Sequence, residues 1–153
     1  KINKFLTEMI IKYNKLNGYL TICHYHRGDI EYRGYYINNK KNGKHNTYKF
    51  DIMQTETYYI NCMKNMYSCI NSENGKLYSK DYWVNNKLNG DGFTYYQSGA
   101  IKEKWWIIND KNNGEFINYS ENGAIISKTY YINDIYIAYS KTYKEILMKT
   151  KNT

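Results

Sequence analysis

The residues best suited to chemistry are a short run of metal-ligand types, Cys23-His24-Tyr25-His26. On a strand, side chains two apart point to the same side, so His24 and His26 would both reach one zinc ion. A structural zinc site needs four ligands and a catalytic one usually three, yet His45 is the only other histidine and no Cys-x-x-Cys pair exists. We therefore predict no metal site and no cofactor. His24 and His26 are expected on the solvated face of a strand, with Cys23 packed as a small apolar residue.

Enzymatic chemistry has equally little support. A nucleophile would need a neighbouring base, but nothing marks Cys62 or Cys69 as one, and acidic residues form no pair at a repeated catalytic spacing. Gly90-Asp91-Gly92 has the start of a phosphate-binding GxGxxG loop, although no Lys-Ser/Thr follows and no helix begins there. We predict a protein without catalytic residues.

Composition limits the class of partner. The net charge of +8 suggests an acidic partner, but Asn, Lys, Ile and Tyr, all encoded by AT-rich codons, supply 80 of 153 residues, so much of the basicity reflects codon usage. Interleaved Lys and Tyr suit single-stranded nucleic acid, but no block of like charges appears, which argues against that partner. An anionic membrane surface stays open. Three cysteines, an odd count, and no apolar run of membrane-spanning length predict an intracellular protein with free thiols, cytoplasmic or in a virion if viral.

A repeat of about 24 residues organises the chain. YYINNKKNG (35–43), YWVNNKLNG (82–90) and WIINDKNNG (106–114) are its clearest copies. Weaker copies begin at Ile10, Tyr58 and Tyr130, where Met66 and Ala138 replace the final glycine in the last two. We predict one domain, residues 1–153, with six units near 10–34, 35–57, 58–81, 82–105, 106–129 and 130–153.

Glycines mark two positions in each unit, and Asn-Gly pairs supply the positive φ angles that tight hairpin turns need. The predicted turn glycines are Gly18, Gly43, Gly90 and Gly114 at the first position, and Gly75, Gly99 and Gly123 at the second, where Asp51 substitutes in the second unit. Gly34 lies outside the pattern and receives no special role. The intervening segments suit strands, so each unit is predicted to be a β-hairpin.

The resulting fold class is all-β, an elongated, twisted antiparallel β-meander. Twelve strands about 4.8 Å apart would make a sheet roughly 55–60 Å long. Residues 142–151 (TYKEILMKTK) lack the glycine pattern and carry helix formers, so a short C-terminal capping helix is predicted there. Leu77, Ile101 and Ile125 are expected to form one inward column.

Aromatic doublets give the candidate binding site. The doublets Tyr58-Tyr59, Tyr82-Trp83, Trp105-Trp106 and Tyr130-Tyr131 place a large ring on each face of the sheet. The rings left outside would form a ladder of the residue types enriched at interfaces. We predict that Tyr59, Trp83, Trp105 and Tyr131 contact a protein partner or a second copy of the chain. The alternative is that the rings only shield the sheet and brace their cross-strand neighbours.

The pattern Y-x-N-x-K-x-N-G followed by Y-x-x-x-G resembles MORN repeats over roughly residues 10–140. It is most similar to the antitoxin-like variant found in bacteria and large DNA viruses. The departures are Met66, Ala138 and Asp51 at glycine positions. The resemblance implies a β-meander without catalytic machinery that serves in scaffolding, protein contact or membrane association.

The sequence is compatible with four functions. The leading one is a non-enzymatic scaffold for protein–protein contact, structural or virion-associated. The others are an antitoxin or immunity protein that inhibits a toxin, a module docking on anionic membrane, and an enzyme whose site the repeats do not reveal.

Overall fold

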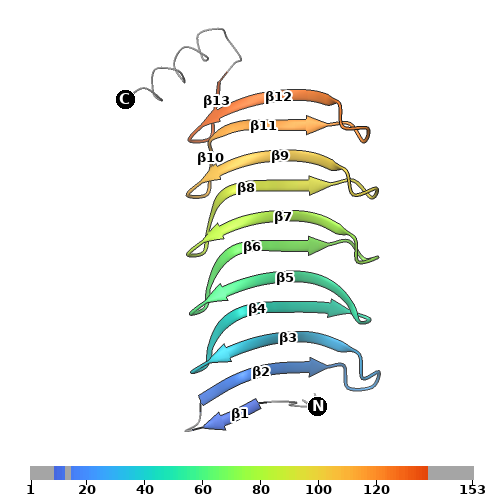
Figure 1. Cartoon of the computed structure of the whole chain (residues 1–153), viewed down its shortest axis with the longest axis vertical. Coiled ribbons are helices and arrows are strands. Elements are labelled where there is room, and N and C mark those ends of the chain that lie inside the picture. The colour runs from blue at the N-terminus through green and yellow to red at the C-terminus, as the bar shows by residue number, and fades with distance from the viewer. Residues whose placement is uncertain (1–8, 13–14, 138–153) are drawn as a thin grey trace.

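The computed structural model describes residues 9–12 and 15–137, which form one layer of antiparallel strands stacked along a single axis (Figure 1). The strands are β1 (Met9–Lys12), β2 (Lys15–Cys23), β3 (Ile30–Ile37), β4 (Lys40–Lys49), β5 (Ile52–Ile60), β6 (Met63–Asn71), β7 (Leu77–Val84), β8 (Lys87–Tyr95), β9 (Ile101–Ile108), β10 (Lys111–Asn112), β11 (Gly114–Tyr119), β12 (Ile125–Ile132) and β13 (Ile135–Ile137). Strand order in the sheet follows the sequence, and β10 and β11 both pair with β9. The all-β antiparallel meander is confirmed.

The predicted helix at 142–151 lies outside the described residues, as does Ala138. Within the described ranges, no helix has the length and apolar character needed to cross a membrane.

Two-residue turns reverse the chain along the edge drawn on the left in Figure 1. Between β7 and β8, Asn85 and Asn86 have φ angles of 49° and 67°, and Val84 pairs with Lys87 across the turn. After glycine, Asn and Asp tolerate this left-handed conformation best, and two such residues in succession match the twist of the flanking strands. The equivalent turns are Asn38-Asn39, Asn61-Cys62, Asn109-Asp110 and Asn133-Asp134.

The first-position glycines are therefore not the hairpin turns that the sequence suggested. Gly90 has a φ of 127° but lies inside β8, where the register with β7 shifts between the Asp81–Gly92 and Trp83–Leu88 pairs. Such a bulge needs the positive φ angle that glycine supplies. Gly18, Gly43 and Gly114 also lie within strands, with φ angles of 107°, 73° and 96°. Met66 adopts a φ of 62° at this position.

Second-position glycines lie in the turns of the opposite edge. The N–H of Gly75 donates to the carbonyl of Ser72 at 2.8 Å, and the φ of Gly75 is 81°. Gly99 and Gly123 close equivalent turns with Tyr96 and Ser120, with φ angles of 89° and 86°. In the second unit, Phe50 and Asp51 form a two-residue turn with φ angles of 52° and 61°.

The recurring asparagines connect each two-residue turn to the preceding hairpin. Asn86 accepts the N–H of Lys64 with Oδ1 at 2.7 Å and returns its own N–H to the Lys64 carbonyl at 3.0 Å. Asn65 Oδ1 accepts the N–H of Asn85 at 3.1 Å. The reciprocal pair recurs between Asn39 and Leu16, Cys62 and Lys41, Asp110 and Leu88, and Asp134 and Asn112. These bonds satisfy polar groups that the turns would otherwise leave without partners.

A single layer buries few side chains. Among the described residues, the buried apolar side chains are Ile117 and Tyr130, which are 8% and 7% exposed. The expectation of an inward column was wrong, since Ile101 is 39% and Ile125 58% exposed. Both begin a strand directly after a turn, at the edge of the single layer.

Candidate protein-binding surfaces

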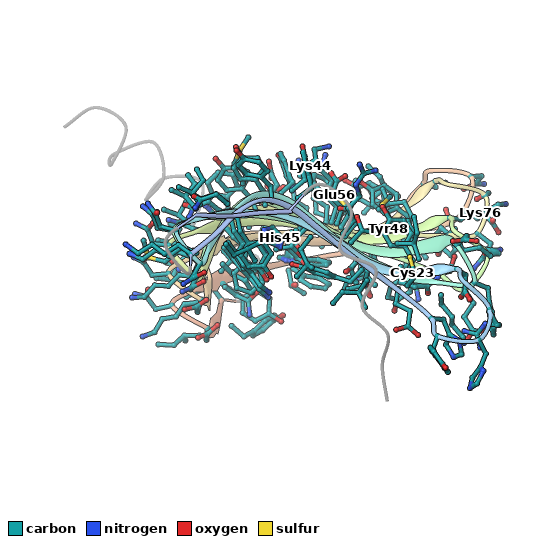
Figure 2. All side chains as sticks on the ribbon, turned by 90° about the horizontal axis from the view of Figure 1, so that it is seen from below. Cys23, Lys44, His45, Tyr48, Glu56 and Lys76 are labelled. Carbon is teal, nitrogen blue, oxygen red and sulfur yellow. The ribbon has the colours of Figure 1, made fainter. Side chains whose placement is uncertain are left out.

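The two faces of the sheet carry different side chains (Figure 2). One face, named here the His45 face, presents His45, while Lys44 and Glu56 point to the other side. That second face, the Trp106 face, also carries Trp106, because alternation along paired strands places it there. Both faces hold a ring from most doublets.

Tyr59, Trp83, Trp105 and Tyr131 all lie on the His45 face, in β5, β7, β9 and β12. All four are half-buried. Lysine side chains lie over two of them, with Lys41 Nζ 5.0 Å from the ring centre of Tyr59 and Lys64 Nζ 4.5 Å from that of Trp83. The structure brings the four rings to one face, where neighbouring side chains cover part of each.

Trp105 and Tyr131 are covered by other rings. Trp105 stacks on Phe116 with centres 6.0 Å apart and planes inclined by 13°, and Tyr131 meets Tyr136 edge-on at 6.2 Å. These ring contacts are what the alternative from sequence describes, in which the rings brace cross-strand neighbours. The role of the four residues in partner contact stays a prediction.

His45 is the centre of a tyrosine cluster on the same face. The ring is 4% exposed and meets Tyr36 and Tyr59 edge-on, with centres 5.2 and 5.0 Å away. Nε2 lies 2.9 Å from the carbonyl oxygen of Tyr35, which only accepts, so Nε2 carries the hydrogen and Nδ1 accepts the hydroxyl of Tyr32. Burial lowers the pKa of His45, and burial also raises the pKa of Tyr32. The cluster therefore favours the neutral imidazole.

Two glycines make room for rings on the His45 face. A Cβ at Gly34 would overlap the imidazole of His45, and a Cβ at Gly92 would overlap the indole of Trp105. The sequence pattern gave Gly34 no role, and this interpretation was wrong, because its importance depends on His45 in the neighbouring strand.

A groove of about 380 Å³ on the His45 face lies beside Trp105 and includes Asp81, Glu103 and Phe116. Burial raises the pKa of Asp81. Glu103 accepts the hydroxyl of Thr94 at 2.7 Å. Asp81 and Glu103 are the titratable residues among those that line this groove.

The Trp106 face carries a row of side chains that pair directly across neighbouring strands. The pairs are Tyr19 with Tyr35, Lys44 with Tyr58, Tyr67 with Tyr82, Asp91 with Trp106, and Glu115 with Tyr130. A groove of about 350 Å³ lies in this row and is lined by Tyr67, Tyr82, Val84, Asn89, Gly90, Asp91 and Trp106.

A column of exposed β-branched residues runs beside this row, one from each hairpin next to its two-residue turn. The members are Ile37, Ile60, Val84, Ile108 and Ile132, between 38% and 46% exposed. With Tyr19, Tyr67 and Trp106, which are 43%, 38% and 44% exposed, the column makes the Trp106 face the more open apolar surface. Exposed apolar side chains gathered on one face of a protein are typical of binding surfaces.

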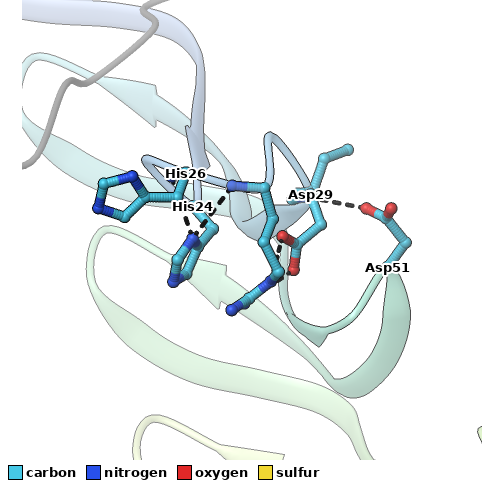
Figure 3. A network of polar contacts seen from close by, with 6 residues as sticks. His24, His26, Asp29 and Asp51 are labelled. Carbon is cyan, nitrogen blue, oxygen red and sulfur yellow. Dashed lines mark hydrogen bonds and ion pairs between the residues drawn. The ribbon is translucent and has the colours of Figure 1, made fainter.

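The metal-ligand run forms a turn rather than a strand (Figure 3). β2 ends at Cys23, and His24 Nδ1 accepts the N–H groups of His26 and Arg27 at 3.3 and 3.4 Å. The expectation that His24 and His26 lie along a strand was wrong, because the strand ends at Cys23 and the loop begins at His24. In the described residues, no three His, Cys, Asp or Glu side chains gather closely enough to hold a metal ion.

The cysteines have structural surroundings. Cys62 is exposed, and its Sγ accepts the N–H of Lys41 at 3.2 Å. Cys69 is half-buried, and burial raises the pKa of its thiol, which opposes formation of a thiolate nucleophile.

Sequence reasoning missed the groove at Asp91. A usable signal existed, because the residue that follows the first glycine position of a unit lies opposite an aromatic residue of the next strand. These residues are Tyr19, Lys44, Tyr67, Asp91 and Glu115.

Comparison with known proteins adds no relative. No family model matches the chain, and no curated protein matches it significantly.

Proposed function

We propose that the protein is a non-enzymatic repeat scaffold that binds another protein along the Trp106 face. The observation that carries this proposal is the exposed β-branched column, which repeats once per hairpin beside partly exposed tyrosine and tryptophan rings. Stacked repeats create extended binding surfaces because equivalent side chains recur at a fixed spacing. Scaffolding is also what the resemblance to MORN repeats implies.

The His45 face is the less favourable surface for a partner. Its rings, including the four proposed from sequence, are covered in part by lysines or by other rings. Cations also lie over rings of the Trp106 face, with Arg33 over Tyr19 and Lys80 over Tyr67, but the β-branched column beside these rings is exposed.

Substitutions at matched exposed isoleucines on opposite faces test the proposal. Ile108 on the Trp106 face is 43% exposed, and Ile70 on the His45 face is 47% exposed. Ile108→Glu should abolish co-purification of a specific partner from the native cell, while Ile70→Glu should retain it, with melting curves showing that both fold. Trp83→Ser and Trp105→Ser test the ladder proposed from sequence. A partner that still co-purifies with Ile108→Glu, but not with Ile70→Glu or with the tryptophan variants, would place the contact on the His45 face and refute the proposal. A toxin recovered as the partner would identify the protein as an antitoxin.

A second candidate is docking on an anionic membrane surface. Three members of the column each lie opposite an exposed lysine, namely Ile37 with Lys40, Val84 with Lys87 and Ile108 with Lys111. Apolar side chains beside lysines favour binding to acidic headgroups. Flotation with vesicles of acidic or neutral lipid tests it: acidic vesicles should carry the protein at low salt and release it at high salt. Equal flotation with both lipids would refute the electrostatic part.

A further inference from the structure

The groove of about 350 Å³ on the Trp106 face combines three aromatic rings with one carboxylate. Tyr67 and Tyr82 meet edge-on with ring centres 4.9 Å apart, and Asp91 lies opposite Trp106 in the next strand pair. We propose that this groove binds a basic side chain, lysine or arginine, of a partner polypeptide. The inference rests on the proposed function and names the chemistry of one contact on that face.

Asp91 is the carboxylate of this row that lacks a cation. The equivalent Glu115 pairs with Lys128 at 2.6 Å and accepts the hydroxyl of Tyr130 at 2.5 Å. Glu56, on the same face, pairs with Lys44 at 3.1 Å. Asp91 is half-buried and makes no ion pair or side-chain hydrogen bond within residues 9–12 and 15–137. A half-buried carboxylate without a partner gains most from a cation that arrives from outside.

The Trp106 ring also lacks a cation among the described residues. On this face Lys80 Nζ lies 3.9 Å from the ring centre of Tyr67, and Lys104 Nζ lies 5.8 Å from that of Phe93. Trp106 is 44% exposed, and in the described sheet no cation lies over it. Tryptophan is the best aromatic partner for a cation. Among the described residues, Asp91 therefore has no cation beside it and Trp106 has none over its ring, although the two lie opposite each other.

Gly90 and Val84 give the groove its shape. A Cβ at Gly90 would approach the Tyr82 ring to 3.2 Å, so glycine leaves space beside that ring. Tyr82 and Val84 offer apolar walls for the methylene groups of a long basic side chain, and Asp91 faces its charged end. Asp91 is the charged residue among those that line the groove, and Lys80 Nζ already lies over one lining ring, Tyr67, so the open position for a cation is at Asp91 and Trp106.

Titration with blocked single amino acids tests the proposal without the natural partner. The probes are N-acetyl-lysine methylamide and its arginine, glutamine and norleucine equivalents, read by the Trp106 indole N–H resonance, which Trp106→Phe identifies. The lysine and arginine probes should shift this resonance saturably, and the two neutral probes should not. Asp91→Asn should weaken binding roughly threefold to tenfold, as expected for one exposed charge pair. Asp91→Glu should restore most of it, and Glu121→Gln, which removes the same charge in a distant turn, should have no effect.

Three results would overturn the proposal: an equal response to the norleucine probe, an equal response from Asp91→Asn, or no saturable response to either basic probe. Failure of the scaffold proposal is separate, because Ile108→Glu tests docking on the Trp106 face without changing Asp91. If Asp91→Asn weakens binding of the basic probes as expected but leaves partner capture unchanged, the scaffold stands and the partner does not use this groove, which also overturns the inference.

Discussion

Cys62 occupies a turn position where its neighbours along the sheet have Asn or Asp, and replacing it with asparagine should stabilise the protein. Its φ angle is 69°, and its Sγ accepts the N–H of Lys41 at 3.2 Å. At the equivalent position, Asn86 Oδ1 accepts at 2.7 Å, as does Asp110 Oδ1. Sulfur is a weak acceptor, and cysteine lacks the tolerance of asparagine for positive φ.

The expected size of the effect has two parts. A normal hydrogen bond in place of a weak one is worth about 0.5–1 kcal/mol, and relief of left-handed strain adds a comparable amount. Because Cys62 is exposed, little packing is lost. Cys62→Asn should therefore raise the free energy of unfolding by about 1–2 kcal/mol, or Tm by about 3–6 °C at this chain length.

Chemical unfolding in urea measures the change, and the reverse substitution is the matched control. Asn86→Cys should lower the free energy of unfolding by a similar amount, with an unchanged m-value in both variants. Cys62→Gly relieves the strain but supplies no acceptor, so it should fall between wild type and Cys62→Asn. If Cys62→Asn is no more stable than wild type while Asn86→Cys is harmless, the reciprocal hydrogen bonds do not stabilise the stack.

Three further predictions follow from the strands. Met66→Gly should stabilise by about 0.5–1 kcal/mol, because glycine adopts the φ of 62° without strain, and an unchanged urea midpoint would contradict this. Gly92→Val should destabilise by about 2–4 kcal/mol, because its Cβ overlaps Trp105, and near-UV circular dichroism should report the displaced indole; a neutral result would show that the indole moves at no cost. Burial lowers the pKa of His45, so the unfolded chain binds its proton more strongly and stability should fall as the pH drops below about 6.5, the ordinary histidine value. His45→Gln should flatten that slope in urea titrations, whereas His26→Gln should not, and equal slopes in all three proteins would exclude His45 as the cause.

The sequence predicts the fold class because turn chemistry is local. The tight hairpin turns of this sheet use positive φ angles, and Asn, Asp and Gly supply most of them. The pattern does not say which positive φ makes the turn. Asn85-Asn86 and Gly90 are both suited to a turn. Only the register of β7 with β8 shows that Asn85-Asn86 forms the turn and that Gly90 lies in a bulge.

Side-chain contacts between neighbouring strands could not be predicted from the local sequence pattern. Gly34 needs to be glycine because His45 lies opposite it across β3 and β4. The doublets gave no preferred face, because a single layer has no interior side. On the His45 face, Lys41 and Lys64 each lie over a ring of the following strand, which only the pairing of those strands reveals.

The row on the Trp106 face shows how stacked hairpins acquire a specific contact. The backbone places the residue after the first glycine position of each unit, Met66 in the third, opposite an aromatic ring in the next strand, whatever that residue is. Glu115 at this position is paired with Lys128, whereas Asp91 has no cation beside it among the described residues. Because each hairpin contacts mainly its neighbours, a change at one such position alters one site and leaves the stack intact. The chemistry of recognition in this fold therefore depends on which charges the repeat leaves unpaired.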